Sequence, residues 1–286
     1  MSNTANADDP SALRSAVRHR TRRFVSSSRA HHFTELVTAD ESRRAPEVRV
    51  EHAGKRFGSV LALDDVSITI PAGSSLALVG ESGAGKSTLL RSINRLDDLD
   101  AGRVLIDGRD VRERDPVALR RSIGYVPQEG GLLPHWRVGR NVALVPWLGG
   151  QPDLSTRADS ALRLTGLDGA LADRWPHELS GGQRQRVAIA RALAGGQSLL
   201  LLDEPFGALD AITRSDLQQT MRAIREQRPL TIVLVTHDLR EAMHLANVVA
   251  VLRRGRIEQM AAPDVLRDIP ATPYVAELLA RAELRG

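Results

Sequence analysis

The chain has 286 residues, of which 42% are hydrophobic and 26% charged, so it can build a sizeable core and is neither fibrous nor wholly disordered. It contains no cysteine, which excludes a disulfide-bonded scaffold and any cysteine-ligated zinc or iron–sulfur site. The net charge of +4 is uneven, because residues 1–45 carry eight arginines against five acids and the remainder is nearly neutral. No stretch of the sequence is apolar and long enough to span a bilayer.

Residues 1–45 mix Ser, Thr, Ala, Asp and Arg without a sustained helical or strand period. This composition predicts a basic, disordered extension, and residues 46–286 are predicted to form one domain. An alternative interpretation is a basic amphipathic segment at Leu13–Val25.

From Glu47 the pattern changes to short strands separated by turns. Strands are predicted at Val48–His52, Val66–Ile70 and Val104–Ile106, and the last of these runs into Asp107-Gly108, a dipeptide typical of tight hairpins. These segments predict an antiparallel sheet.

Three later segments, Ser75–Val79, Ser198–Leu202 and Thr231–Val235, are apolar throughout rather than alternating. Such runs are typical of parallel strands that are buried on both faces. Each is followed by polar residues, and ligands of open α/β sheets bind beyond the carboxyl ends of the strands. The three strand ends are therefore predicted to form one shared site.

Helical periodicity at Ser155–Thr165 and Gly182–Leu193 predicts a helical subdomain, roughly residues 129–197, inserted between the first two of these strands. After the third strand, a strand hairpin is predicted around Arg254-Gly255 and a last helix near Pro273–Glu283. The expected fold class is α/β.

The pattern G-x-x-x-x-G-K-[ST] is present between a predicted strand and a predicted helix, the context in which it forms a phosphate-binding loop. Its residues are Gly80, Glu81, Ser82, Gly83, Ala84, Gly85, Lys86, Ser87 and Thr88. Successive backbone N–H groups of such a loop surround a phosphate, Lys86 reaches the β- and γ-phosphates, and Ser87 binds Mg²⁺. An ordinary glycine-rich turn is the alternative, which the flanking strand and helix disfavour.

Two adjacent acids, Asp203 and Glu204, follow the run of four leucines that ends the second buried segment. In nucleotide hydrolases Asp203 would hold the Mg²⁺ shell, and Glu204 would orient or deprotonate the attacking water. Adjacent acids at a strand end are otherwise solvated charges. Together with the phosphate-binding loop they indicate ATP and Mg²⁺ as cofactors.

The run Leu179-Ser180-Gly181-Gly182-Gln183-Arg184-Gln185-Arg186 resembles the signature sequence of ATP-binding cassette (ABC) ATPases, and the resemblance covers residues 47–260. It implies a P-loop NTPase core of the ABC type with an antiparallel β subdomain and an inserted helical subdomain. In that family, Ser180 and Gly182 bind the γ-phosphate of ATP held by the other subunit, and the resemblance implies that Ser180, Gly181, Gly182 and Gln183 are cofactor-binding residues. The active unit would be a head-to-tail, ATP-dependent dimer with a second copy of the chain.

Four further positions match the family pattern. Phe57 resembles the aromatic that stacks on adenine, and Gln128 the glutamine that touches Mg²⁺ and the attacking water. Asp210 resembles an aspartate of the dimer contact, and His237 the histidine that contacts the γ-phosphate. Taken singly, Phe57 would be a core aromatic, Gln128 a solvated loop glutamine and His237 a structural histidine.

The stretch Ile123–Trp136, followed by Asn141–Pro146, resembles the cassettes of uptake systems for glycine betaine, choline or proline betaine. The resemblance implies the motor subunit of an importer on the cytoplasmic face of the membrane, with permease subunits as partners and a solute-binding protein as an indirect one. An amino-acid or polyamine importer is an alternative. A soluble mechanical ATPase that binds nucleic acid through residues 1–45 is another, which the nearly neutral body disfavours. The sequence identifies neither the solute nor the permease.

Overall fold

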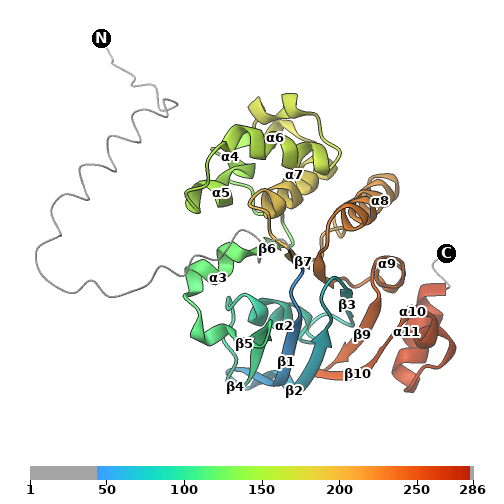
Figure 1. Ribbon diagram of the computed structural model, residues 1–286. Helices are drawn as coiled ribbons and strands as arrows, with labels where there is room; N and C mark the ends of the chain where they lie inside the picture. Colours follow the sequence, from blue (N-terminus) through green and yellow to red (C-terminus); the bar gives the residue numbers. More distant parts are fainter. Residues whose placement is uncertain (1–43, 284–286) are drawn as a thin grey trace, which may run out of the picture. The chain divides into compact units, whose positions relative to one another are not determined.

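The computed structural model describes residues 44–283, which contain two sheets (Figure 1). The first is antiparallel, with strand order β2-β1-β4-β5. Its strands are β1 (Val48–Phe57), β2 (Val60–Ile70), β4 (Ala101–Ile106) and β5 (Arg109–Asp110). This sheet is the predicted antiparallel one, and its first two strands are longer than the sequence pattern indicated.

The second sheet has six strands in the order β10-β9-β3-β8-β7-β6. Its strands are β3 (Ser75–Val79), β6 (Ile123–Val126), β7 (Leu199–Asp203), β8 (Thr231–Val235), β9 (Val248–Arg253) and β10 (Arg256–Ala261). All neighbours pair in parallel except β9 and β10, which form an antiparallel hairpin. The parallel arrangement brings the carboxyl ends of β3, β6, β7 and β8 to one edge.

Helices connect these strands. The α-helices are α2 (Lys86–Ile93), α3 (Pro116–Ser122), α4 (Val138–Val142), α5 (Leu144–Leu148), α6 (Leu154–Leu164), α7 (Gly181–Leu193), α8 (Ala211–Gln227), α9 (Leu239–Leu245), α10 (Pro263–Asp268) and α11 (Pro273–Glu283), and the 3-10 helices are η2 (Val111–Glu113), η3 (Gly169–Asp173) and η4 (Pro176–Glu178). None of the helices in residues 44–283 is long and apolar enough to cross a membrane.

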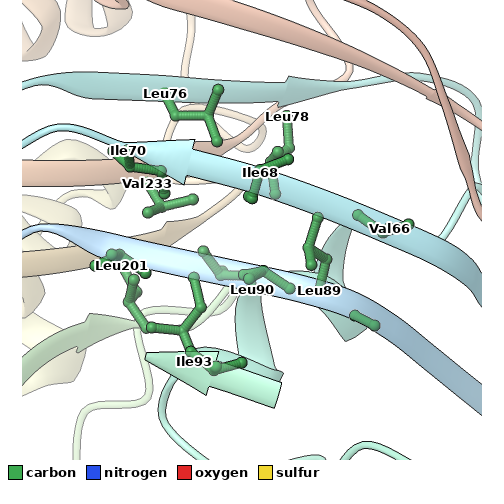
Figure 2. Packing of buried hydrophobic residues seen from close by; sticks show 14 of the residues in the cluster. Val66, Ile68, Ile70, Leu76, Leu78, Leu89, Leu90, Ile93, Leu201 and Val233 are labelled. Carbon is green, nitrogen blue, oxygen red and sulfur yellow. The ribbon is translucent and has the colours of Figure 1, made fainter. Parts of the chain in front are cut away.

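The main core lies around α2, between the two sheets (Figure 2). Every residue of β3, β7 and β8 is buried, which explains why these strands read as unbroken apolar runs. Leu89, Leu90 and Ile93 of α2 are fully buried against side chains of both sheets, among them Ile68 and Leu78. This packing fixes the start of α2 close to the ends of the parallel strands.

Helices α4 and α6 pack on α7 around a separate apolar cluster. Val138 and Val142 of α4, Leu162 of α6 and Val187 of α7 are all fully buried there. The opposite face of α7 packs on β6, so this one helix joins the helical group to the parallel sheet.

Strand β6 does not appear among the predicted strands, although it carries the chain to Gln128. Ile123, Tyr125 and Val126 favour a strand, but the segment has only four residues and ends before a proline, so it is shorter than a typical strand. Its Gly124 is required by packing, because a Cβ there would lie 2.5 Å from the carbonyl oxygen of Ala192 in α7. Strand β7 is shifted by one residue from the prediction, so that Asp203 is its last residue.

The predicted basic extension, including the segment Leu13–Val25, lies outside the described residues except for Arg44 and Ala45. Ala45 is buried, and the carbonyl oxygen of Pro46 accepts a hydrogen bond of 2.6 Å from Thr231 Oγ1.

Candidate functional site

The glycine-rich loop connects the buried strand β3 to the first turn of α2. Gly85 precedes this helix with φ +102°, and a Cβ at this position would lie 2.3 Å from the carbonyl oxygen of Ala62 in β2. Both the dihedral angle and the close approach exclude a side chain. The antiparallel sheet therefore supports the loop from one side.

Lys86 begins α2 and is 6% exposed. Its ammonium donates hydrogen bonds of 2.8 Å to the carbonyl oxygens of Gly80 and Glu81, so the loop curls around its own lysine. Burial lowers the pKa of this ammonium, and the nearby carboxylates of Glu204 and Asp203 partly oppose that shift. A cation held in this way is placed to bind a phosphate that enters the loop.

Asp203 is buried at the end of β7, where it faces the first turn of α2. Its Oδ1 accepts a hydrogen bond of 2.9 Å from Ser87 Oγ, and its Oδ2 one of 3.2 Å from a guanidinium N–H of Arg91. Ser87 and Asp203 thus lie together, as the motifs predicted. Arg91 was not predicted, because nothing in the neighbouring sequence distinguishes it from the many other arginines of the chain.

Glu204 directly follows Asp203 and has φ +47°, a left-handed conformation that is uncommon for a residue other than glycine. Its N–H donates to the carbonyl oxygen of Val235 at the end of β8. Its Oε2 accepts a hydrogen bond of 3.3 Å from Gln128 Nε2 and lies 3.2 Å from His237 Nδ1. Three residues from the ends of three strands therefore meet at one carboxylate oxygen.

Phe57 ends β1 and is 48% exposed, so it is not a core aromatic. The Lys55 ammonium lies 5.2 Å from the centroid of its ring. Phe57 pairs with Val60 across the β1–β2 hairpin, the same hairpin whose Ala62 touches Gly85. An exposed aromatic face on this hairpin is available to stack on a flat ligand.

The segment Ser180–Gln183 starts α7 with a capping box. Ser180 Oγ accepts a bond of 3.2 Å from the Gln183 N–H, and Gln183 Oε1 accepts one of 2.9 Å from the Ser180 N–H. Gly182 is buried, and a Cβ there would lie 2.2 Å from Thr213 Cγ2 in α8.

Asp210 caps the start of α8 by accepting bonds from the N–H groups of Ile212 and Thr213 and from Thr213 Oγ1. These bonds hold the pKa of the Asp210 carboxyl below its usual value, and the bond from the Thr213 hydroxyl has the largest effect. Within residues 44–283, no hydrogen bond or ion pair connects Asp210 or the segment Ser180–Gln183 to the phosphate-binding loop. Asp210 and the segment Ser180–Gln183 therefore form a second group of predicted site residues, separate from the group around the phosphate-binding loop and Glu204.

Two buried side chains that the sequence analysis missed hold the segment that follows Gln128. The Arg191 guanidinium in α7 donates bonds of 2.6 Å to the carbonyl oxygens of Gly130 and Gly131. Asn141 Nδ2 donates to the carbonyl oxygens of Leu133, Trp136 and Arg137, and its Oδ1 accepts from the Leu133 N–H.

At the end of this segment, Trp136 packs edge-on against Trp147, with 6.3 Å between ring centroids. The Arg140 guanidinium lies 4.1 Å from the Trp136 ring centroid. Trp147 is 50% exposed and Leu148 43%. A partly exposed apolar surface thus lies at one end of a segment whose other end, Gln128, contacts Glu204.

Comparison with known proteins agrees with this geometry. The family model of the ABC transporter matches residues 63–207. The glycine betaine uptake system ATP-binding protein YehX of Escherichia coli is 43% identical over 83% of this chain and 78% of its own length. The sulfate/thiosulfate import ATP-binding protein CysA of Nocardia farcinica is 47% identical over 81% of this chain and 70% of its own. The chain spans 78% of the length of YehX and 60% of the length of the carnitine transport ATP-binding protein OpuCA of Listeria monocytogenes.

Among solved structures, the dimeric post-hydrolysis state of the ATP-binding cassette MJ0796, bound to ADP and Pi, superposes with a TM-score of 0.69. It is 33% identical, and the alignment covers 76% of this chain and 98% of that one. The predicted fold, an ABC-type P-loop core with an antiparallel β subdomain and an inserted helical subdomain, is therefore confirmed.

The chain belongs to the ABC transporter family, as an ATP-binding subunit. The predicted resemblance to glycine betaine and choline cassettes is also confirmed, and membership of this family implies that the chain binds nucleotide.

Proposed function

We propose that this protein hydrolyses ATP as the motor subunit of an importer for quaternary-amine osmoprotectants such as glycine betaine, choline or proline betaine. The observation that carries the proposal is the meeting of Gln128 and His237 at one oxygen of Glu204, beside the phosphate-binding loop. The loop binds the phosphates, and the three polar residues face the position that an attacking water would take. This arrangement suits in-line attack on a γ-phosphate.

Each predicted residue has a role in this proposal. Lys86 exchanges its bonds to the loop carbonyls for bonds to the β- and γ-phosphates, and the N–H groups of residues 81–88 surround them. Phe57 stacks on adenine. Glu204 accepts a proton from the attacking water, Gln128 orients that water, and His237 contacts the γ-phosphate.

The loop region offers the donors that Mg²⁺ prefers. Ser87 Oγ and the buried Asp203 carboxylate are oxygen donors 2.9 Å apart, and Gln128 adds an amide oxygen. Mg²⁺ takes one or two protein oxygens together with substrate phosphates and water, so a site with few protein ligands fits it. Bound Mg²⁺ would neutralise phosphate charge; Ser87 and Asp203 would hold it, with Gln128 at its edge.

A second copy of the chain completes the site in this proposal. In the segment Ser180–Gln183 at the start of α7, the N–H groups of Ser180 and Gln183 serve the capping box, so the N–H groups of Gly181 and Gly182 would contact the anion. A helix start of this kind binds anions, and the γ-phosphate held by another subunit supplies one. Asp210 lies in the same interface. The dimer is head-to-tail and forms when ATP binds, which is in keeping with the dimeric form of MJ0796.

The surface made by Trp136, Trp147 and Leu148 binds a permease subunit, and the segment from Gln128 to Trp136 transmits the state of the nucleotide to it. A partly exposed aromatic surface is typical of a protein interface. The protein would then lie on the cytoplasmic face of the membrane as a peripheral subunit, and an extracytoplasmic solute-binding protein would act on it only through the permease.

The hydrolysis is tested with purified protein, Mg²⁺ and ATP. Glu204→Gln should lower turnover by about 10²- to 10⁴-fold, because a general base is lost, and should leave ATP bound. Lys86→Ala should weaken both binding and turnover. Glu226→Gln, a change at an exposed acid of α8, serves as the matched control. Wild-type turnover in Glu204→Gln would contradict the role assigned to Glu204.

The identity with CysA supports a second candidate, an importer of sulfate or thiosulfate. The two candidates are separated by uptake of labelled glycine betaine, choline, sulfate, amino acids and polyamines in a strain that lacks this protein and in the complemented strain. Loss of betaine or choline uptake under osmotic stress supports the first candidate. Loss of sulfate uptake alone supports the second, and loss of amino-acid or polyamine uptake would overturn both.

A further inference from the structure

A buried carboxylate outside the nucleotide site has contacts toward both groups of predicted site residues, the one that contains His237 and the one that contains Asp210. Glu241, in the first turn of α9, is 7% exposed. Burial raises the pKa of its carboxyl, and the hydrogen bond from Thr236 and the charges of Arg214 and His237 oppose this shift only in part. Burying a carboxylate costs stability unless partners compensate, so the contacts of Glu241 need an explanation.

One oxygen of Glu241 binds the residue next to His237. Thr236 Oγ1 donates a hydrogen bond of 2.5 Å to Glu241 Oε2, and the same hydroxyl accepts one of 3.0 Å from the Asp238 N–H. Thr236 is itself buried. Thr236 and Asp238, the residues on either side of His237, are therefore tied together by the Thr236 hydroxyl. The bond to Glu241 sets the orientation of that hydroxyl.

The other oxygen of Glu241 faces the start of α8. Arg214 Nε lies 3.4 Å from Glu241 Oε1, an ion pair without the geometry of a hydrogen bond. The same guanidinium donates a bond of 3.0 Å to the carbonyl oxygen of Leu209, the residue before Asp210. Arg214 thus ties the segment that carries Asp210 to Glu241.

A structural explanation is that an acid in the first turn of α9 stabilises the helix through its dipole. That explanation accounts for the position of Glu241 but not for a guanidinium partner that also holds Leu209. A chain of contacts runs from Leu209 through Arg214 and Glu241 to Thr236. It connects the residue before Asp210 with the residue before His237.

We infer that Glu241 and Arg214 are positioning residues that set His237 against Glu204 according to the placement of the Asp210 segment. Dimer formation, which would press on Asp210, then favours the His237 position that supports hydrolysis. This inference rests on the proposed function, because it takes from it the roles of Asp210 and His237.

The test measures ATP turnover and thermal unfolding of Glu241→Gln, Arg214→Met and the double variant in the full-length protein. Glu241→Gln keeps an oxygen that accepts from Thr236 and removes only the charge that pairs with Arg214. Each single variant should lower kcat by about five- to tenfold, the value of about one hydrogen bond, with KM for ATP unchanged. Glu277→Gln, which removes an exposed ion pair with Arg281 in α11, is the matched control and should behave as wild type.

The double variant separates positioning from stability. Removing both charges leaves no unpaired buried ion, so its melting temperature should recover toward that of the wild type, whereas kcat should stay low and fall no further than in the single variants. Recovery of kcat together with the melting temperature would overturn the inference, as would wild-type kcat in the single variants. The turnover of the wild-type protein is measured first, in the same preparation. If the wild type does not hydrolyse ATP, the proposed function fails, whereas the outcomes above concern the inference alone.

Discussion

The turn between β9 and β10 supports the phosphate-binding loop, although it follows the loop by about 170 residues in the sequence. The Gly255 N–H donates a bond of 3.0 Å to the carbonyl oxygen of Ala84, and its own carbonyl oxygen accepts one of 2.9 Å from the Asp64 N–H. Gly255 has φ +78°, and a Cβ there would lie 2.9 Å from the carbonyl oxygen of Ala62. We predict that Gly255→Ala weakens ATP binding without touching the nucleotide.

The magnitude follows from two costs. An alanine in the left-handed region costs about 1–2 kcal/mol, and a Cβ forced against backbone adds about 1–3 kcal/mol. If the turn shifts to relieve the contact, it gives up the bond to Ala84, worth about 1 kcal/mol. Stability should therefore fall by about 2–5 kcal/mol and the affinity for ATP by about fivefold.

Gly108 provides the matched control. It occupies the equivalent position of the β4–β5 turn with φ +76°, but a Cβ there would meet no atom within 4 Å. Gly108→Ala thus carries the same backbone cost without the contact, and should lose only about 1–2 kcal/mol. Denaturant unfolding and calorimetric titration with ATP measure both quantities. Equal losses of stability in the two variants, with wild-type ATP affinity in Gly255→Ala, would refute the reasoning.

Three further predictions follow from the site. In the Glu204→Gln background, sedimentation should show a dimer with ATP and mostly monomer without it; equal dimerisation with ADP would count against the role of Ser180. Trp136→Ala should reduce solute uptake in cells while the purified protein keeps its basal ATPase rate, and a variant with normal uptake would place the permease contact elsewhere. Because burial holds the pKa of Glu241 above its ordinary value of 4.5, this carboxyl favours folding most at lower pH. The stability of the wild type relative to Glu241→Gln should therefore fall as pH rises from 4.5, and a difference that rises with pH would contradict that direction.

Local patterns in the sequence were enough to predict much of this site. The phosphate-binding loop, the acids Asp203 and Glu204 at the end of β7 and the signature segment that starts at Ser180 each consist of consecutive residues whose chemistry depends on their immediate neighbours. The unbroken apolar character of β3, β7 and β8 also predicted parallel strands, because burial on both faces removes the alternation of polar and apolar residues. These features predict which strand ends share one edge.

Other features depend on contacts between segments that are distant in the sequence. Strand β6 has only four residues, and its place in the sheet depends on β7 as a partner and on α7, which covers Gly124. The contact of Gly85 with Ala62 and the bond from Gly255 to Ala84 arise only when both sheets pack around α2. The pairing of Glu241 with Arg214 likewise requires α8 and α9 to lie together. The sequence next to Glu241 or Arg214 does not indicate a partner for either residue. The energy of a buried charge depends on the groups that the folded chain places around it.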